Sequence, residues 1–155
     1  MKKNIRLLTR NEIPRVWEID RTELIERLYV LQQGQLVLSE QRFDMKGWPE
    51  GEAEHYTPVL LESAERGAPF WGVFEDDKLV AAASVVPQWR GQDNTLLQLS
   101  FLHISHQQRG QGLARILFDY CVEYAKQKGA SGLYISSTPS ENSVNFYQHM
   151  GCRLI

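Results

Sequence analysis

A glycine-containing turn at residues 107–114 carries the residues best suited to chemistry. It follows a run with strand character and leads directly into a helical pattern. The first amides of a helix have no partner inside that helix, and the helix dipole places partial positive charge there. Such amides bind a diphosphate well, and Gly110 and Gly112 allow the backbone to approach a ligand closely. Because Arg109 or Arg115 can add a charged contact, we predict an anion-binding turn.

The residues at and after the two glycines exclude two common classes of phosphate-binding loop. Many strand–helix turns have the same spacing only because they pack tightly, so the glycines alone are weak evidence. A nucleoside-triphosphate loop is excluded because no Gly-Lys-Ser/Thr sequence follows. The dinucleotide fingerprint is excluded because its third glycine position is Arg115.

Hydrophobic periodicity predicts the elements that position this turn. In the first half we expect a strand at residues 4–8, a helix from Thr9 to residue 19, a helical pattern at 24–34, an irregular segment at 35–49 and a helix at 49–66. In the second half we expect strands at residues 69–74, 79–86 and 95–105, a helix at 111–129, a strand at 133–135 and a helix at 142–150. This order predicts a mixed α/β sheet with at least one strand–helix–strand crossover.

Two motifs stand in the context that this order predicts. Gln107-x-x-Gly110-x-Gly112 after a long strand is similar to the Q/R-x-x-G-x-G/A acetyl-CoA signature of the GNAT superfamily. Residues 133–147 resemble the strand, loop and helix that follow in that family, and residues 150–152 resemble its closing turn. The resemblance implies one N-acetyltransferase domain over residues 1–155, with a central twisted mixed sheet flanked by helices. It also implies acetyl-CoA as the cofactor and an amine as the second substrate.

The resemblance assigns the cofactor to three segments. Backbone amides of the turn would hold the pyrophosphate, and amides of a splayed strand near residues 102–104 would hold the cofactor's arm and acetyl group. The implied cofactor contacts are Leu102, His103, Ile104, Gln107, Gln108, Arg109, Gly110, Gln111, Gly112, Leu113, Ala114, Arg115, Asn142 and Tyr147.

The reaction implied by the family is direct attack of an amine on the thioester, where positioning of the reactants lowers the barrier. Tyr147 is the catalytic residue we expect to give a proton to the departing thiolate. The alternative is that Tyr147 only packs on the core.

The base stays open, because Ser100 occupies the position where many relatives carry a glutamate. The alternatives are His103, Glu23, Glu75, Asp93, a water chain, or an amine that arrives already neutral.

The substrate is expected to meet the first half of the chain, where residues 11–66 hold 12 acidic and six basic groups. Such a segment can attract a cation, although solvated helix faces explain the same charges. Aromatic walls and a carboxylate suit an ammonium group. The candidates are Phe43, Asp44, Trp48 and Tyr56, and the alternative is that the aromatics only fix the N-terminal helices to the sheet.

Composition limits the other classes of function. A net charge of -2 over 155 residues gives no nucleic-acid footprint, and no apolar run approaches the ~18 residues of a membrane span. The four histidines show no metal-ligand spacing. Cys121 and Cys152 show no metal or redox pairing, so we expect a cytoplasmic protein with reduced thiols.

The C-terminus departs from the family pattern, since only four residues follow Gly151 where relatives usually add two strands. Either the chain has been shortened and these last strands are missing, or another subunit supplies the sheet edge. We therefore expect a homodimer or partial instability. Three functions therefore stay open: an N-acetyltransferase for a small amine, a protein lysine or N-terminal acetyltransferase, and a non-catalytic acetyl-CoA-binding module.

Overall fold

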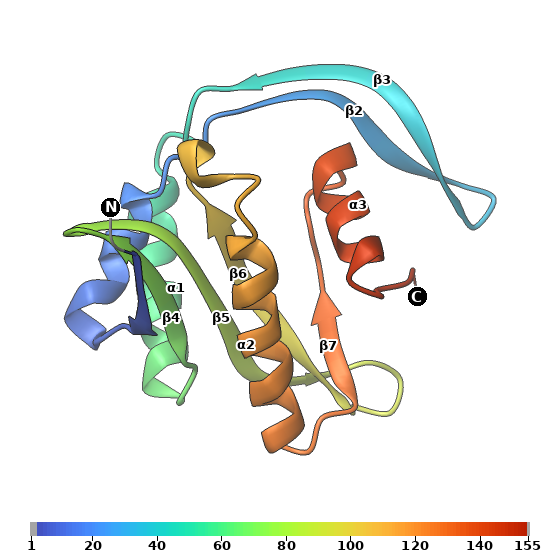
Figure 1. Cartoon of the computed structure of the whole chain (residues 1–155). Helices are drawn as coiled ribbons and strands as arrows, with labels where there is room; N and C mark the ends of the chain where they lie inside the picture. Colours follow the sequence, from blue (N-terminus) through green and yellow to red (C-terminus); the bar gives the residue numbers. More distant parts are fainter. Residues whose placement is uncertain (1–2, 155) are drawn as a thin grey trace.

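A five-stranded sheet forms the centre of the computed structural model, which describes residues 3–154 (Figure 1). Its strands, in spatial order, are β1 (Lys3–Leu7), β4 (Phe70–Glu75), β5 (Lys78–Arg90), β6 (Leu96–Ile104) and β7 (Gly132–Ile135). The first four are antiparallel neighbours, and β7 runs parallel to β6. The mixed α/β sheet predicted from the sequence is therefore confirmed.

Helix α2 (Leu113–Gln127) covers one face of the sheet and provides the crossover from β6 to β7 (Figure 1). Its stripe of Leu117, Phe118 and Cys121 packs into the same buried cluster as Val85 and other sheet residues. Burying each large apolar side chain contributes about 1.5–3 kcal/mol, which holds the helix and the turn before it in place.

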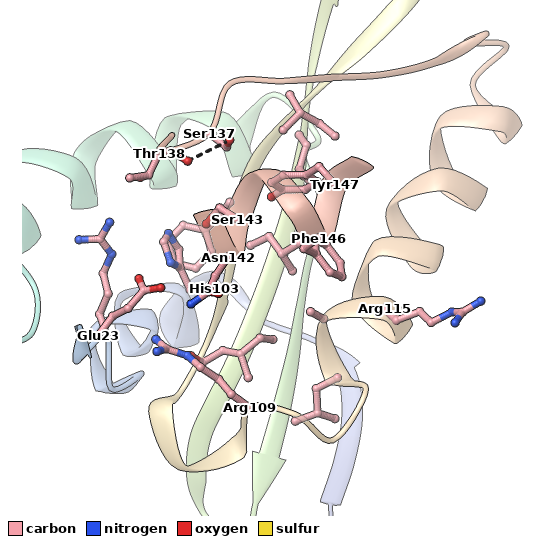
Figure 2. Close-up of a pocket in the computed structure, with 18 of the residues that line it drawn as sticks. Glu23, His103, Arg109, Arg115, Ser137, Thr138, Asn142, Ser143, Phe146 and Tyr147 are labelled. Atoms are coloured by element: carbon pink, nitrogen blue, oxygen red, sulfur yellow. Dashed lines mark hydrogen bonds between the residues drawn. The ribbon is translucent and has the colours of Figure 1, made fainter. Parts of the chain in front are cut away.

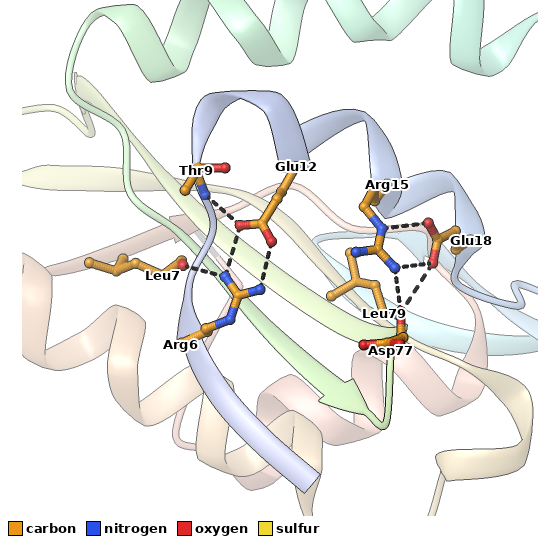
Figure 3. Close-up of polar contacts among 8 residues, drawn as sticks. All are labelled: Arg6, Leu7, Thr9, Glu12, Arg15, Glu18, Asp77 and Leu79. Carbon is orange, nitrogen blue, oxygen red and sulfur yellow. Dashed lines mark hydrogen bonds and ion pairs between the residues drawn. The ribbon is translucent and has the colours of Figure 1, made fainter.

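The 3-10 helix η1 (Arg10–Glu18) and helix α1 (Glu52–Glu65) cover the opposite face. Two guanidinium–carboxylate pairs stabilise η1, and one of them, Arg6 with Glu12, joins it to β1 of the sheet (Figure 3). Glu12 accepts from both terminal nitrogens of Arg6, at 2.8 and 2.6 Å, and from the backbone N–H of Thr9 at 2.9 Å. Arg15 pairs with Glu18 at 2.7 Å.

The predicted helical pattern at residues 24–34 and the irregular segment at 35–49 are wrong. These residues form a hairpin of β2 (Glu23–Gln32) and β3 (Gln35–Met45). Gln33 and Gly34 make its two-residue turn with φ of 50° and 77°, the left-handed geometry that matches the twist of a hairpin. Cross-strand pairs such as Val30 with Val37 then replace the one-sided helical contacts that the leucine spacing suggested.

The hairpin arches over helix α3 (Glu141–His149) (Figure 1). The Tyr29 N–H donates to the Pro139 carbonyl at 2.7 Å, and the Tyr29 hydroxyl donates to Asn145 Oδ1 at 2.6 Å. Arg27 pairs with Glu141 at 3.0 Å. The first half of the chain is thus fixed to the segment that follows β7.

A β-bulge at Ser100 divides β6 into two parts. Val85 of β5 pairs with Leu99 and the adjacent Ser84 pairs with Phe101, so Ser100 is the extra residue. We expected Leu97, Leu99, Phe101 and His103 on one face of the strand. Leu97 and Leu99 instead pack on the α2 side and Phe101 packs on the side of η1 and α1, because the bulge reverses the alternation.

Candidate functional site

The predicted anion-binding turn lies between β6 and α2. After a short 3-10 turn, η2 (His106–Gln108), Gly110 and Gly112 both adopt left-handed conformations, with φ of 77° and 82°. A side chain on either residue would strain the backbone, although nothing lies within 4 Å of the added Cβ. In the described part of the chain, the amides of residues 110–115 donate no hydrogen bond, as expected for the start of a helix.

The edge of β6 that faces β7 is free beyond Leu99. Strand β7 pairs with β6 only over Leu96 to Leu99, whereas β5 continues to pair with β6 as far as Ile104. The two strands therefore separate where β6 approaches the turn. This separation leaves peptide groups of β6 available to an extended polar ligand.

A cavity of about 600 Å³ joins the free edge of β6 to the turn and to α3 (Figure 2). Twelve predicted cofactor residues line it: Leu102, His103, Ile104, Gln108, Arg109, Gly110, Gly112, Leu113, Ala114, Arg115, Asn142 and Tyr147. Gln107 and Gln111, the other two, do not line it. The side chain of Gln111 accepts from Lys3.

Gln107 and Arg109 use their side chains within the protein. Gln107 Nε2 donates to Asp20 Oδ2 at 2.9 Å, and Arg109 donates to the carbonyls of Thr22 and Ile104 at 2.9 and 3.2 Å. Hydrogen bonds from Thr22 and Gln107 lower the pKa of Asp20 to about 2, so its carboxylate is ionised. These contacts fix the turn to the segment before β2.

The backbone adds two further bonds to this connection. The His106 N–H donates to the Asp20 carbonyl at 2.8 Å, and the Asp20 N–H donates to Ser105 Oγ at 2.8 Å. We call residues 20–22 and 105–109, joined in this way, the turn clamp. Sequence reasoning missed it because Asp20 and Gln107 are 87 positions apart.

Arg21 and Glu23 line the cavity from the start of β2. Sequence reasoning named Glu23 only as one possible base and missed Arg21. Both side chains are half-buried. Arg21 lies over the Trp48 ring, 5.3 Å from its centroid.

Tyr147 lies on α3 against Phe118 and Phe146, and it lines the cavity (Figure 2). Burial and the neighbouring Cys152 and Cys121 raise the pKa of its phenol, which therefore keeps its proton at neutral pH. In the region covered by the structure, the hydroxyl has no hydrogen-bond partner. It is free to donate to a ligand atom.

His103 also lines the cavity, but its electrostatics make it a weak base. Burial, together with the charges of Arg21 and Arg109, lowers the pKa of His103 to about 3. Of the predicted carboxylate bases, Glu75 accepts from Gln108 Nε2 at 3.2 Å, and neither Glu75 nor Asp93 lines the cavity. Glu23 is the one carboxylate that does, among residues 3–154.

The four predicted substrate residues lie outside the cavity wall. Trp48 is closest, because it stacks on Phe101 and meets His103 edge to face at 4.9 Å, and both of these line the cavity. Asp44, on β3, pairs at 2.6 Å with Lys46, which follows the strand. Phe43 and Tyr56 are exposed side chains of β3 and α1.

Gln108 offers an acceptor at the cavity wall. Its side chain is only 8% exposed, and its Oε1 is buried without a partner in the described chain. A buried acceptor of this kind costs free energy until a donor reaches it.

Two features are absent from residues 3–154, a metal-binding cluster and a membrane-spanning helix. No group of three or more histidine, cysteine, aspartate or glutamate side chains is placed to hold a metal ion. No described helix combines the length and apolarity needed to cross a membrane.

Comparisons with known proteins agree with this geometry. Residues 25–152 match the model of the Acetyltransferase (GNAT) family. N-acetyltransferase 8B of Homo sapiens is 28% identical over 93 residues, which cover 57% of this chain and 40% of that protein. The chain therefore spans less than half the length of this relative.

Solved structures show the same fold at low identity. An acetyltransferase from Bacillus anthracis, in complex with acetyl coenzyme A, superposes with a TM-score of 0.71 at 14% identity, covering 96% of this chain and 83% of that one. Glucosamine-6-phosphate N-acetyltransferase from Arabidopsis thaliana gives a TM-score of 0.63 at 14% identity, covering 100% and 94%.

Proposed function

Because the chain belongs to the acetyltransferase (GNAT) family, we propose that it moves an acetyl group from acetyl-CoA to a primary amine of a small molecule. The proposal rests on a single cavity that combines unpartnered backbone amides with a free strand edge and ionisable side chains. Its wall includes the unpartnered amides of the turn, the free edge of β6, Glu23 and Tyr147.

The residues of the turn fit a coenzyme A diphosphate. The amides of residues 110–115 supply donors and partial positive charge, and the left-handed glycines leave the backbone open to the ligand. Arg115, in the first turn of α2, lines the cavity beside these amides and can add a charged contact to phosphate oxygens. Farther along, the β6 edge and Gln108 Oε1 offer partners to the amides of the cofactor's arm.

The bound cofactor supplies a thioester, and the protein's residues position an amine against it. A new bond joins the amine nitrogen to the carbonyl carbon, the carbon–sulfur bond breaks, and the sulfur ends as a thiol. The β6 amides near residues 102–104 stabilise the negative charge that develops on the carbonyl oxygen. The ammonium loses its first proton to solvent past Glu23. The Tyr147 hydroxyl gives its proton to the sulfur, and the second proton lost by the acceptor nitrogen restores the Tyr147 hydroxyl, so that one proton is released overall.

A small acceptor is favoured by the walls on both sides of the cavity. Asn142 and Ser143 line it, and α3, which carries them, is fixed to the hairpin by Tyr29 and Arg27. Glu23 lies on the same β2 strand. The hairpin thus sets the distance between the two walls, which suits a bounded pocket better than an open peptide groove.

Thiol release in the presence of acetyl-CoA tests the proposal. The full chain is incubated with acetyl-CoA and a panel of small amines and lysine-containing peptides, and free coenzyme A is measured with a thiol reagent. Release with small amines is expected. Release only with peptides would contradict the small-molecule acceptor, and thermal stabilisation by coenzyme A without any release would contradict catalysis.

A further inference from the structure

Two opposite charges face the cavity from the start of β2 without neutralising each other. Arg21 and Glu23 are half-buried and line the same cavity. Within residues 3–154, neither side chain forms an ion pair or a side-chain hydrogen bond. A half-buried guanidinium and carboxylate that leave each other unpaired are available to a ligand carrying both signs of charge.

The segment holds the two side chains in a fixed place. Arg21 lies between two anchored residues, and Glu23 follows directly as the first residue of β2. The Asp20 carboxylate accepts from Gln107 and the Thr22 carbonyl accepts from Arg109, which anchors this segment to the cofactor turn. The Trp48 ring supports the Arg21 guanidinium. Both charges are thus preorganised, which lowers the entropy cost of binding.

We propose that the acceptor is a zwitterionic amine of the amino-acid class, whose carboxylate binds Arg21 and whose ammonium group binds Glu23. This inference rests on the proposed acetyltransferase function and names its substrate class. A planar guanidinium binds a carboxylate through two parallel hydrogen bonds, which makes the contact selective as well as strong. Figure 2 shows Glu23 on the side of the cavity where His103 and Asn142 lie, opposite Arg115.

The same charges disfavour the other classes of amine. A polyamine brings a second cation toward Arg21 and Arg109, which like-charge repulsion opposes. A neutral amine leaves the Arg21 guanidinium without a partner in a half-buried place. The arrangement therefore selects for a carboxylate on the acceptor as well as for an amine.

Matched pairs of acceptors test whether Arg21 binds the carboxylate of the substrate. We would measure kcat/KM for L-amino acids and for their carboxamides, which keep the amine and lose the carboxylate. Arg21→Gln is expected to lower kcat/KM for the acids by about 10- to 100-fold, the loss of a charged hydrogen-bonded pair, and for the amides by less than about 3-fold. Comparing each variant with the unmodified protein cancels the different basicities of the two amines.

Arg115→Gln is the matched control, since Arg115 lines the same cavity near the turn. It is expected to weaken coenzyme A binding in calorimetry and to leave the acid-to-amide ratio unchanged. Calorimetric binding of the amino acid to the coenzyme A complex gives a readout independent of turnover, and Arg21→Gln should weaken it. An equal loss of kcat/KM for acids and amides in Arg21→Gln would overturn the inference. Weaker coenzyme A binding by the same variant would also overturn it. Thiol release with no amine at all would overturn the proposed function, and the acceptor class with it.

Discussion

The proposed proton transfer depends on the Tyr147 hydroxyl. Burial raises the pKa of this phenol, so it stays protonated, and it faces the cavity without a partner in the described structure. Tyr147→Phe removes only the hydroxyl and keeps the ring contacts with Phe118 and Phe146. We expect kcat to fall by about 10²- to 10⁴-fold, the usual contribution of a positioned acid, with the Kd for coenzyme A little changed. Steady-state kinetics and calorimetry check this, and an unaltered kcat would leave Tyr147 a packing residue.

At Gly112, the effect of a substitution on ligand binding can be separated from its effect on backbone strain. Gly112 and Gly129 lie at opposite ends of α2 with φ of 82° and 84°, and neither has any atom within 4 Å of an added Cβ. Gly112→Ala and Gly129→Ala should therefore cost a similar ~1–2 kcal/mol of unfolding free energy. Only Gly112→Ala should weaken coenzyme A binding, by about tenfold or more, because its methyl group enters the cavity wall. Denaturant unfolding and calorimetry on both variants measure the two effects.

Helix η1 depends on an ion pair whose effect varies with pH (Figure 3). The Arg6 guanidinium and the Thr9 N–H lower the pKa of Glu12 from 4.5 to about 2. A lowered folded-state pKa adds stability above the unfolded value, and this stability is lost as the pH falls from about 4.5 through about 2. Glu12→Gln should therefore lower the Tm at pH 7, with a difference from the unmodified protein that shrinks toward pH 2.5.

The control for this series is Glu65→Gln. The pair of Glu65 with Arg10 has side chains 61% and 58% exposed, so solvent and salt screen it. Its removal should change the Tm little at any pH. A Glu12→Gln difference that stayed constant down to pH 2.5 would show that the ion pair is not its source.

At the scale of the whole molecule, the second half of the chain was predictable because its signals are local. The helical pattern of α2, the glycines of the turn and the short apolar strand each lie within one contiguous stretch, and each element formed. Of the apolar residues expected on the helix stripe, Ile116 and Tyr120 are exposed. The hairpin at 23–45 was not predictable from leucine spacing, because cross-strand pairing decided its structure. Arg21 and the turn clamp depend on contacts between distant segments, which no spacing in one segment reveals.

The turn clamp links the two halves of the molecule, and this link can be measured by hydrogen exchange. Coenzyme A should protect the amides of residues 110–115 directly, and residues 20–25 through the clamp. Asp20→Ala removes the acceptor of the Gln107 and Thr22 donors, so ligand protection of residues 20–25 should fall by about tenfold while the turn stays protected. Tyr29→Phe, which alters β2 only where it meets α3, should keep protection at both places. If residues 20–25 stayed equally protected in Asp20→Ala, the carboxylate would not be the coupling element, and the remaining clamp contacts of His106, Ser105 and Arg109 would hold the wall of the acceptor site.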